Sequence, residues 1–219
     1  MFAVVTSTTL TSKSSSIALR ISGFVAFGCT TKAYLFSSSR NAMVRSVGTI
    51  GGVAILVERS PRLLIGNNRI LDHQNAVVLH FSDQTIIFRN RIVVSGAWLT
   101  GDVLEADGII AANGIGVRIV GNDITNGFFG VFASGRAGLL SANTLHENLF
   151  GVIFCKVPAG AFQLPSGESF GSVESANLWN AHDNRAFDNL ATGYFVIDGA
   201  NNNTLTRNSA AGNAAYDFE

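Results

Sequence analysis

Apolar and polar residues alternate along this chain in short runs that are bounded by Gly and Asn. The segment "LLIGNNRIL" at residues 63–71 returns 22 positions later as "TIIFRNRIV" at residues 85–93. Alternation with a period of two residues over such short runs is typical of β-strands. Nowhere does it expand into the 3.6-residue period of a helix. The pattern therefore predicts short strands throughout the chain.

The Asn in the middle of this phrase marks a repeat. Aligning the chain on it gives eight units of about 22 residues, with Asn in six of them and Ser in the first two. The eight positions are Ser22, Ser46, Asn68, Asn90, Asn122, Asn143, Asn184 and Asn208. A second apolar phrase follows in most units and begins with Gly, as in "GVFA" from Gly130 and "GVIF" from Gly151. We therefore expect two short strands in each unit.

A fixed period with a polar residue at one bend suits a coil of stacked parallel strands. Each turn lies about 4.8 Å from the last, so that equivalent positions form columns. Asn amides in one column can hydrogen-bond to one another and satisfy the carbonyl groups of the bends. The sequence thus predicts an all-β solenoid of about eight coils, held by an asparagine ladder.

Three segments resemble the parallel β-helix repeat of the pectin-lyase-like superfamily. They are "GNDITNGFFGVFASG", "SANTLHENLFGVIF" and "NNTLTRNSAAGN", and the resemblance extends over residues 17–218. It implies a right-handed single-stranded parallel β-helix. The superfamily includes polysaccharide lyases, uronate epimerases, periplasmic metal-handling proteins and non-catalytic domains. The resemblance therefore implies an extracellular or periplasmic protein that binds a polysaccharide or another glycan.

Two units are longer than the others, and they predict insertions that loop out of the stack at residues 94–106 and 156–177. We expect residues 1–219 to form a single domain, with residues 1–16 as a candidate N-terminal cap. Insertions of a solenoid commonly carry its binding residues. The two insertions are therefore the first places to look for a site.

The first insertion combines one aromatic side chain with three carboxylates, and neighbouring coils should add further aromatic and imidazole groups. An aromatic face suits the apolar face of a sugar ring, and grouped carboxylates suit acid–base chemistry on a glycan. The catalytic candidates at this corner are Asp102, Glu105, Asp107 and His146. The substrate-binding candidates are Trp98, His73 and Phe128. The alternative is a solvated loop that Trp98 anchors.

Arginine recurs directly after the repeated Asn. Arg69 and Arg91 share this column, so two guanidinium groups should lie about one strand spacing apart. Such a pair suits bidentate binding of the carboxylates of a uronic acid polymer. The alternative is that both side chains extend into water over the turn.

Catalytic signatures of the superfamily are mostly missing. The segment "WNAHDN" at residues 179–184 offers His182 and Asp183, but it lacks the Asp-Pro that precedes them in mannuronan epimerases. The resemblance favours a polysaccharide lyase or uronate epimerase acting on an acidic polysaccharide. The alternative is a non-catalytic repeat module for binding or structure, including a fragment of a larger β-helix protein. We expect no cofactor and no metal centre. Calcium bound by Asp102, Glu105 and Asp107 is the alternative, although the regular spacing of a calcium loop is absent.

Composition excludes several other classes of protein. The formal net charge is zero and only 14% of the 219 residues are charged, which disfavours nucleic acid as a partner. No run approaches the roughly 18 apolar residues of a membrane span, and no clear signal peptide is present. Because the last unit ends on an expected strand, we also expect self-association or a partner that covers the C-terminal coil.

Overall fold

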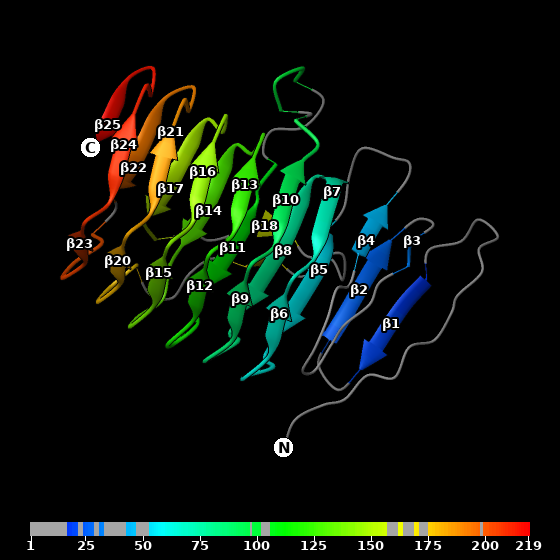
Figure 1. Cartoon of the computed structure of the whole chain (residues 1–219). Helices are drawn as coiled ribbons and strands as arrows, with labels where there is room; N and C mark the ends of the chain where they lie inside the picture. Colours follow the sequence, from blue (N-terminus) through cyan, green and yellow to red (C-terminus); the bar gives the residue numbers. More distant parts are fainter. Residues whose placement is uncertain are drawn as a thin grey trace.

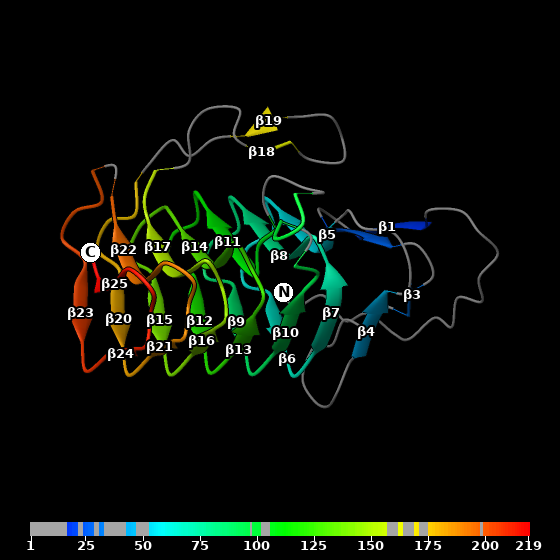
Figure 2. The ribbon, with the colours of Figure 1, turned by 90° about the horizontal axis from the view of Figure 1, so that it is seen from above.

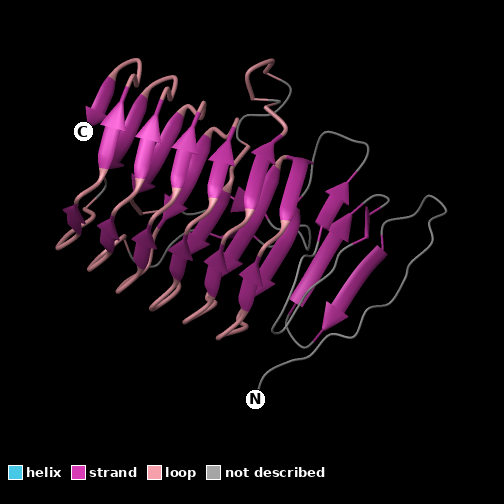
Figure 3. Ribbon diagram, viewed as in Figure 1, coloured by secondary structure: helices cyan, strands magenta, loops and turns pink. Residues whose placement is uncertain are grey.

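The computed structural model describes residues 53–96, 98–101, 106–156, 175–197 and 199–219 with their side chains. Elsewhere it describes only the backbone of the strands that lie within residues 17–46 and 162–170. The described residues form strands, turns and bends, and no helix occurs among them (Figure 3). The predicted all-β class is therefore confirmed.

The strands form a right-handed parallel β-helix, as the sequence predicts. The chain winds through three sheets and returns to each of them once per coil (Figure 1). Seen from above, the sheets run side by side along the stack of coils (Figure 2).

The six-stranded sheet is parallel throughout and contributes the first strand of each complete coil. Its strands are β6 (Leu64–Gly66), β9 (Ile86–Phe88), β12 (Arg118–Val120), β15 (Leu139–Ser141), β20 (Asn180–His182) and β23 (Thr204–Thr206). The eight-stranded sheet contributes the second strand. It contains β3 (Thr31–Lys32), β4 (Met43–Ser46), β7 (Arg69–His73), β10 (Arg91–Val94), β13 (Asp123–Thr125), β16 (Thr144–His146), β21 (Arg185–Phe187) and β24 (Ser209–Ala211).

The nine-stranded sheet contributes the third strand of each coil. It contains β1 (Ile17–Ile21), β2 (Phe24–Gly28), β5 (Val53–Glu58), β8 (Asn75–His80), β11 (Ile109–Ala112), β14 (Phe129–Ala133), β17 (Phe150–Phe154), β22 (Thr192–Val196) and β25 (Tyr216–Phe218). A separate antiparallel pair, β18 (Phe162–Gln163) with β19 (Ser169–Phe170), falls within the second expected insertion. The bounds of the domain and of both insertions stay predictions.

Each coil holds three strands rather than the expected two, because the repeated phrase bends at its Asn. Its first half lies in the six-stranded sheet and its second half in the eight-stranded sheet, as β6 and β7 illustrate. The residue before each ladder Asn has a positive φ, for example 51° at Arg89 and 54° at Ala142. This left-handed residue turns the chain from one sheet into the next.

The expected eight coils are not confirmed, since the described strands form six complete coils and a partial one of β4 and β5. The unit assigned to Ser22 is not a parallel coil, because β1 and β2 pair antiparallel. The unit assigned to Ser46 is out of register: β4 places Met43 opposite Arg69, where the alignment expects Val47, four residues later (47 − 43). Serine has no amide group to join the ladder, so its alignment was weakly constrained.

The asparagine ladder forms as predicted and runs through all six complete coils. The amide nitrogen of Asn143 donates to Oδ1 of Asn184 at 2.9 Å and to the carbonyl oxygen of Ile119 at 2.9 Å. Its own Oδ1 accepts from the backbone and amide N–H groups of Asn122, at 2.9 and 3.0 Å. The other linked pairs are Asn68 with Asn90, Asn90 with Asn122, and Asn184 with Asn208.

The Gly that opens the second phrase is explained by close contact between coils. A Cβ atom built at Gly130 would lie 2.6 Å from the carbonyl oxygen of Gly151, and one at Gly151 would lie 2.5 Å from that of Gly193. Real Cβ atoms do not approach carbonyl oxygens this closely. The recurring Gly therefore allows consecutive coils to pack at the entrance to the nine-stranded sheet.

The core is filled by columns of apolar residues, and where two columns hold small residues, large side chains at other positions fill the space. Inward columns that hold Ile or Leu in most coils hold Ala181 and Ala186 in the coil of β20 and β21. In that region the large side chains of Trp179 and Tyr194 are each only 1% exposed. Large residues at new positions thus replace the volume that the two alanines give up.

We predict that Asn143→Ala destabilises the fold by about 3 kcal/mol, because it leaves several buried donors and acceptors unsatisfied. The shift of the urea unfolding midpoint, followed by circular dichroism, measures this cost. Asn180→Ala is the matched control, since Asn180 is exposed on β20 and its loss should cost less than about 0.5 kcal/mol. Equal costs for the two variants would contradict a structural role of the ladder.

Candidate functional site

The outer face of the eight-stranded sheet carries two parallel columns of side chains. Register places Arg69, Arg91, Asp123, Thr144 and Arg185 opposite one another in the first column. The same register places Leu71, Val93, Thr125, His146 and Phe187 in the second. The residues between the columns, such as Ile92 and Ile124, point into the core and are fully buried. Strand alternation therefore separates the exposed columns from the core.

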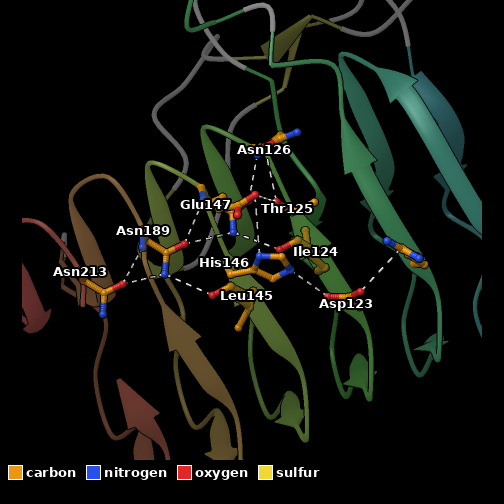
Figure 4. Close-up of polar contacts among 12 residues, drawn as sticks. Asp123, Ile124, Thr125, Asn126, Leu145, His146, Glu147, Asn189 and Asn213 are labelled. Atoms are coloured by element: carbon orange, nitrogen blue, oxygen red, sulfur yellow. Dashed lines mark hydrogen bonds and ion pairs between the residues drawn. The ribbon is translucent and has the colours of Figure 1, made fainter. Parts of the chain in front are cut away.

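His146 lies at the centre of this face and contacts two carboxylates (Figure 4). Its Nε2 is 3.2 Å from Oδ1 of Asp123 on the neighbouring strand β13. Its Nδ1 is 4.0 Å from Oε2 of Glu147, whose carboxylate also accepts a hydrogen bond from the hydroxyl of Thr125 at 3.2 Å. The imidazole is half-buried, and both carboxylates face solvent.

The row extends from Asp123 to an arginine on one side and from His146 to an aromatic ring on the other. Nε of Arg91 lies 3.9 Å from Oδ2 of Asp123. The ring of His146 stacks on Phe187, with 5.1 Å between centroids and 3° between planes. The guanidinium of Arg185 lies 5.5 Å from the centroid of the same Phe187 ring, within the range of a cation–π contact. We call Arg91, Asp123, His146, Phe187 and Arg185 the charged row.

Trp98 and Phe128, both expected to bind substrate, lie at the bend that follows β13. The indole nitrogen of Trp98 donates to the carbonyl oxygen of Asn126 at 2.9 Å, and its ring meets Phe128 edge-on at 5.6 Å. Trp98 also packs against the main core cluster. These contacts anchor the first insertion beside the strand that carries Asp123 and Thr125.

Asp107, expected to be catalytic, is fully buried. Its Oδ1 accepts a hydrogen bond from the backbone N–H of Phe129 at 3.1 Å, and its own N–H donates to Oδ1 of Asn75 at 3.0 Å. It joins consecutive coils in the manner of the ladder asparagines. Asp107 is therefore not exposed to a ligand at the surface, because its carboxylate takes part in the internal packing of the coils.

His73, expected to bind substrate, is buried at the end of β7, where its pairing with β10 becomes irregular. Burial lowers the pKa of its imidazole, and the nearby negative charge of Asp72 opposes this shift. A buried neutral imidazole is poorly placed to contact a polymer outside the sheet. Asp102 and Glu105 lie outside the described residues, so their role stays a prediction.

Arg69 is exposed and lies directly opposite Arg91, as the shared column predicted. The alignment missed Arg185 and Phe187 as site residues, although it contained the signal for the first. Arg185 follows Asn184 as Arg91 follows Asn90. The importance of Phe187 and Asp123 depends on their neighbours in space, which the sequence alone did not give.

A second polar cluster lies at the bend between β20 and β21. The guanidinium of Arg207 donates to both carboxylate oxygens of Asp183, at 2.7 and 2.8 Å, and Nδ1 of His182 is 2.7 Å from Oδ2. The hydrogen bonds from Arg207 and then from His182 hold the pKa of Asp183 well below its ordinary value. This carboxylate is already paired, so the cluster ties two coils together.

Metal coordination requires several donor side chains at one point. Within the described ranges, no group of three or more His, Cys, Asp or Glu side chains is arranged to hold a metal ion. The same part of the chain contains no helix with the length and apolar character that a membrane crossing requires.

Comparison with known proteins identifies one family and several structures of similar fold. The family described as periplasmic copper-binding protein (NosD) matches residues 4–157. A double mutant of the periplasmic alginate epimerase AlgG is 16% identical, with a TM-score of 0.53 over 73% of this chain and 36% of that chain. AlgG without these substitutions is 17% identical, with a TM-score of 0.48 and the same coverage.

The A-module of the Azotobacter vinelandii mannuronan C-5 epimerase AlgE4 is 11% identical, with a TM-score of 0.40 over 77% of this chain and 61% of that chain. At these identities the likeness concerns the fold alone, and the chain spans about a third of the length of AlgG. No curated protein sequence matches the chain.

We predict that stability falls as the pH decreases from about 7 towards 5, partly because of His73. Burial lowers the pKa of His73 in the folded state, whereas the unfolded chain keeps the ordinary pKa of about 6.5. Below about pH 6.5 the unfolded chain therefore binds a proton more readily than the folded chain, which favours unfolding. The contribution is complete above that pH and is lost on acidification. Urea unfolding midpoints at pH 7.5 and 5.5 measure the slope.

His73→Phe should reduce this pH dependence, because a phenyl ring cannot take up a proton. His182→Gln is the control, since His182 lies at the surface cluster and should leave the contribution of His73 intact. An unchanged slope in His73→Phe would show that another group is responsible.

Proposed function

The chain belongs to the NosD family. We propose that it is a periplasmic or extracellular protein and that it binds an acidic polysaccharide on the outer face of its eight-stranded sheet. The location follows the description of the family, which names a periplasmic protein. The charged row supports the ligand class, and a protein of similar fold is named as an alginate epimerase.

The observation that carries this proposal is the pair of exposed arginines at the two ends of the charged row. Carboxylates of a uronic acid chain are suitable partners for guanidinium groups, which bind them through two parallel hydrogen bonds. Arg69 adds a further guanidinium beside Arg91. A neutral glycan would offer these guanidinium groups no carboxylate, so the surface favours an acidic polymer.

Copper is the ligand that the family description names. The four histidines of the chain are dispersed over different strands and surfaces: His73 is buried, His80 lies near Glu58, and His146 and His182 have the contacts given above. Cys155 is buried in the apolar layer on the nine-stranded sheet. Within the described residues these side chains do not fit a copper site, and no step of the proposed function uses one.

Catalysis of the lyase or uronate epimerase type is the second candidate function. The observation that favours it is the contact of His146 with Asp123 on an exposed face, because an imidazole held by a carboxylate can take or give a proton at a bound sugar. If no turnover is found, we propose that the protein is a non-catalytic binding module. We also propose that a partner or a second copy of the chain covers the C-terminal coil.

We predict that the protein binds polygalacturonate or polymannuronate and does not bind a neutral glucan of similar length. Arg91→Gln and Arg185→Gln should each weaken binding roughly five- to tenfold, as expected for the loss of one exposed charge-assisted contact. Isothermal titration calorimetry at low salt measures the affinities. Arg118→Gln is the matched control, because Arg118 is an exposed arginine on β12 in the other sheet.

Failure to bind any uronate polymer, or equal losses in all three variants, would contradict this proposal. Turnover is tested separately by following unsaturated products in the ultraviolet and inversion at C5 by NMR. His146→Gln and Asp123→Asn should abolish any such activity while polymer binding persists.

A further inference from the structure

The charged row follows the axis of the helix, with an arginine at each end and Asp123, His146 and Phe187 between them. It runs from Arg91 on β10 through Asp123 on β13 and His146 on β16 to Phe187 and Arg185 on β21. These four strands are consecutive neighbours in the sheet. The two arginines therefore lie about three strand spacings apart, or roughly 14 Å.

The two guanidinium groups differ in their surroundings. Asp123 lies within 4 Å of Arg91 and partly compensates its charge. Among the described side chains, no carboxylate lies within ion-pair distance of Arg185, which rests over the ring of Phe187 instead. The guanidinium of Arg185 is therefore available to bind an anion, whereas the charge of Arg91 is partly compensated by the carboxylate of Asp123.

His146 lies between these two ends. The carboxylates of Asp123 on β13 and of Glu147 at the end of its own strand lie beside its imidazole, and the guanidinium of Arg185 on β21 lies on the ring of Phe187, which stacks on His146. Thr125 and Phe187, its register neighbours, carry no charge. Histidine is the side chain whose charge normally changes between about pH 5 and 8.

We propose that Arg91 and Arg185 bind two carboxylates of one oligouronate and that protonation of His146 strengthens this binding. A protonated His146 attracts the carboxylate of Asp123 away from Arg91, which frees the guanidinium for the ligand. A carboxylate bound at Arg185 in turn neutralises the guanidinium that lies on the Phe187 ring beside His146. Ligand and proton therefore promote each other's binding, as linkage requires. This inference rests on the proposed function and adds to it the spacing of the recognised charges and their control by pH.

The direction of the pH effect follows from the charges. Uronate carboxylates resemble α-carboxyl groups, which titrate near pH 3.5, and they stay ionised between pH 8 and 5.5. Acidification over this interval adds positive charge to the protein and leaves the ligand unchanged. Because all groups of the row are partly exposed, the gain should be modest, roughly two- to fivefold in affinity.

Oligogalacturonates of increasing length, titrated by calorimetry at pH 8 and 5.5, test the proposal. A sugar ring is about as long as one strand spacing of roughly 4.8 Å, so the fourth sugar is the first that lets one ligand reach both arginines. Affinity should therefore rise sharply from trimer to tetramer. Arg91→Gln and Arg185→Gln should remove this step, and Arg118→Gln should keep it.

The role of His146 has its own readout. Its ring signals, followed by NMR, should titrate at higher pH when the tetramer is bound, and His146→Gln should bind the tetramer equally well at both pH values. Binding without the length step, or with the same pH dependence in His146→Gln, would overturn this inference and leave the proposed function standing. Absence of binding to any uronate, at either pH, would instead overturn the proposed function.

Discussion

The hydrogen-bonded column of asparagine amides is the constraint on which the rest of this structure depends. At each bend the chain leaves one sheet for another, and backbone polar groups beside the ladder asparagines are buried. The side-chain amide of each such asparagine, for example Asn143, donates to the Oδ1 of the ladder Asn in the following coil and to a strand carbonyl oxygen of the preceding coil. Its own Oδ1 accepts a hydrogen bond from the ladder Asn of the preceding coil. Because leaving a buried donor or acceptor unsatisfied costs about 1–3 kcal/mol, the column of amides stabilises the register in which each ladder Asn meets the next.

A fixed register turns sequence positions into surface columns. The residue after each ladder Asn always faces outward on the eight-stranded sheet, and the residue two positions later does the same. Side chains that are 94 residues apart in sequence, Arg91 and Arg185 (185 − 91), thus lie on one line across four neighbouring strands. The solenoid thus orders charged groups at the spacing of its strands, about 4.8 Å.

The residues that match the NosD family and the residues of the charged row overlap only in part. The family match ends at residue 157, while the charged row continues to β21. Two members of the row, Arg185 and Phe187, therefore lie beyond the matched residues. The dispersed histidines and the buried Cys155 provide no copper site within the described coils. The anionic polymer that we propose as the ligand would contact residues on both sides of the end of the family match.

The sequence by itself determined the strand class, the ladder from Asn68 to Asn208 and the pairing of Arg69 with Arg91, because a stacked repeat converts spacing directly into contact. It failed where the repeat signal was weak, at Ser22 and Ser46, and in the number of strands per coil. Only the tertiary structure decided that Asp107 and His73 are buried and that Phe187 joins His146 to Arg185. Local pattern fixes which face a strand residue occupies, whereas the depth of a loop residue and the rotamers of surface side chains depend on neighbours from other coils.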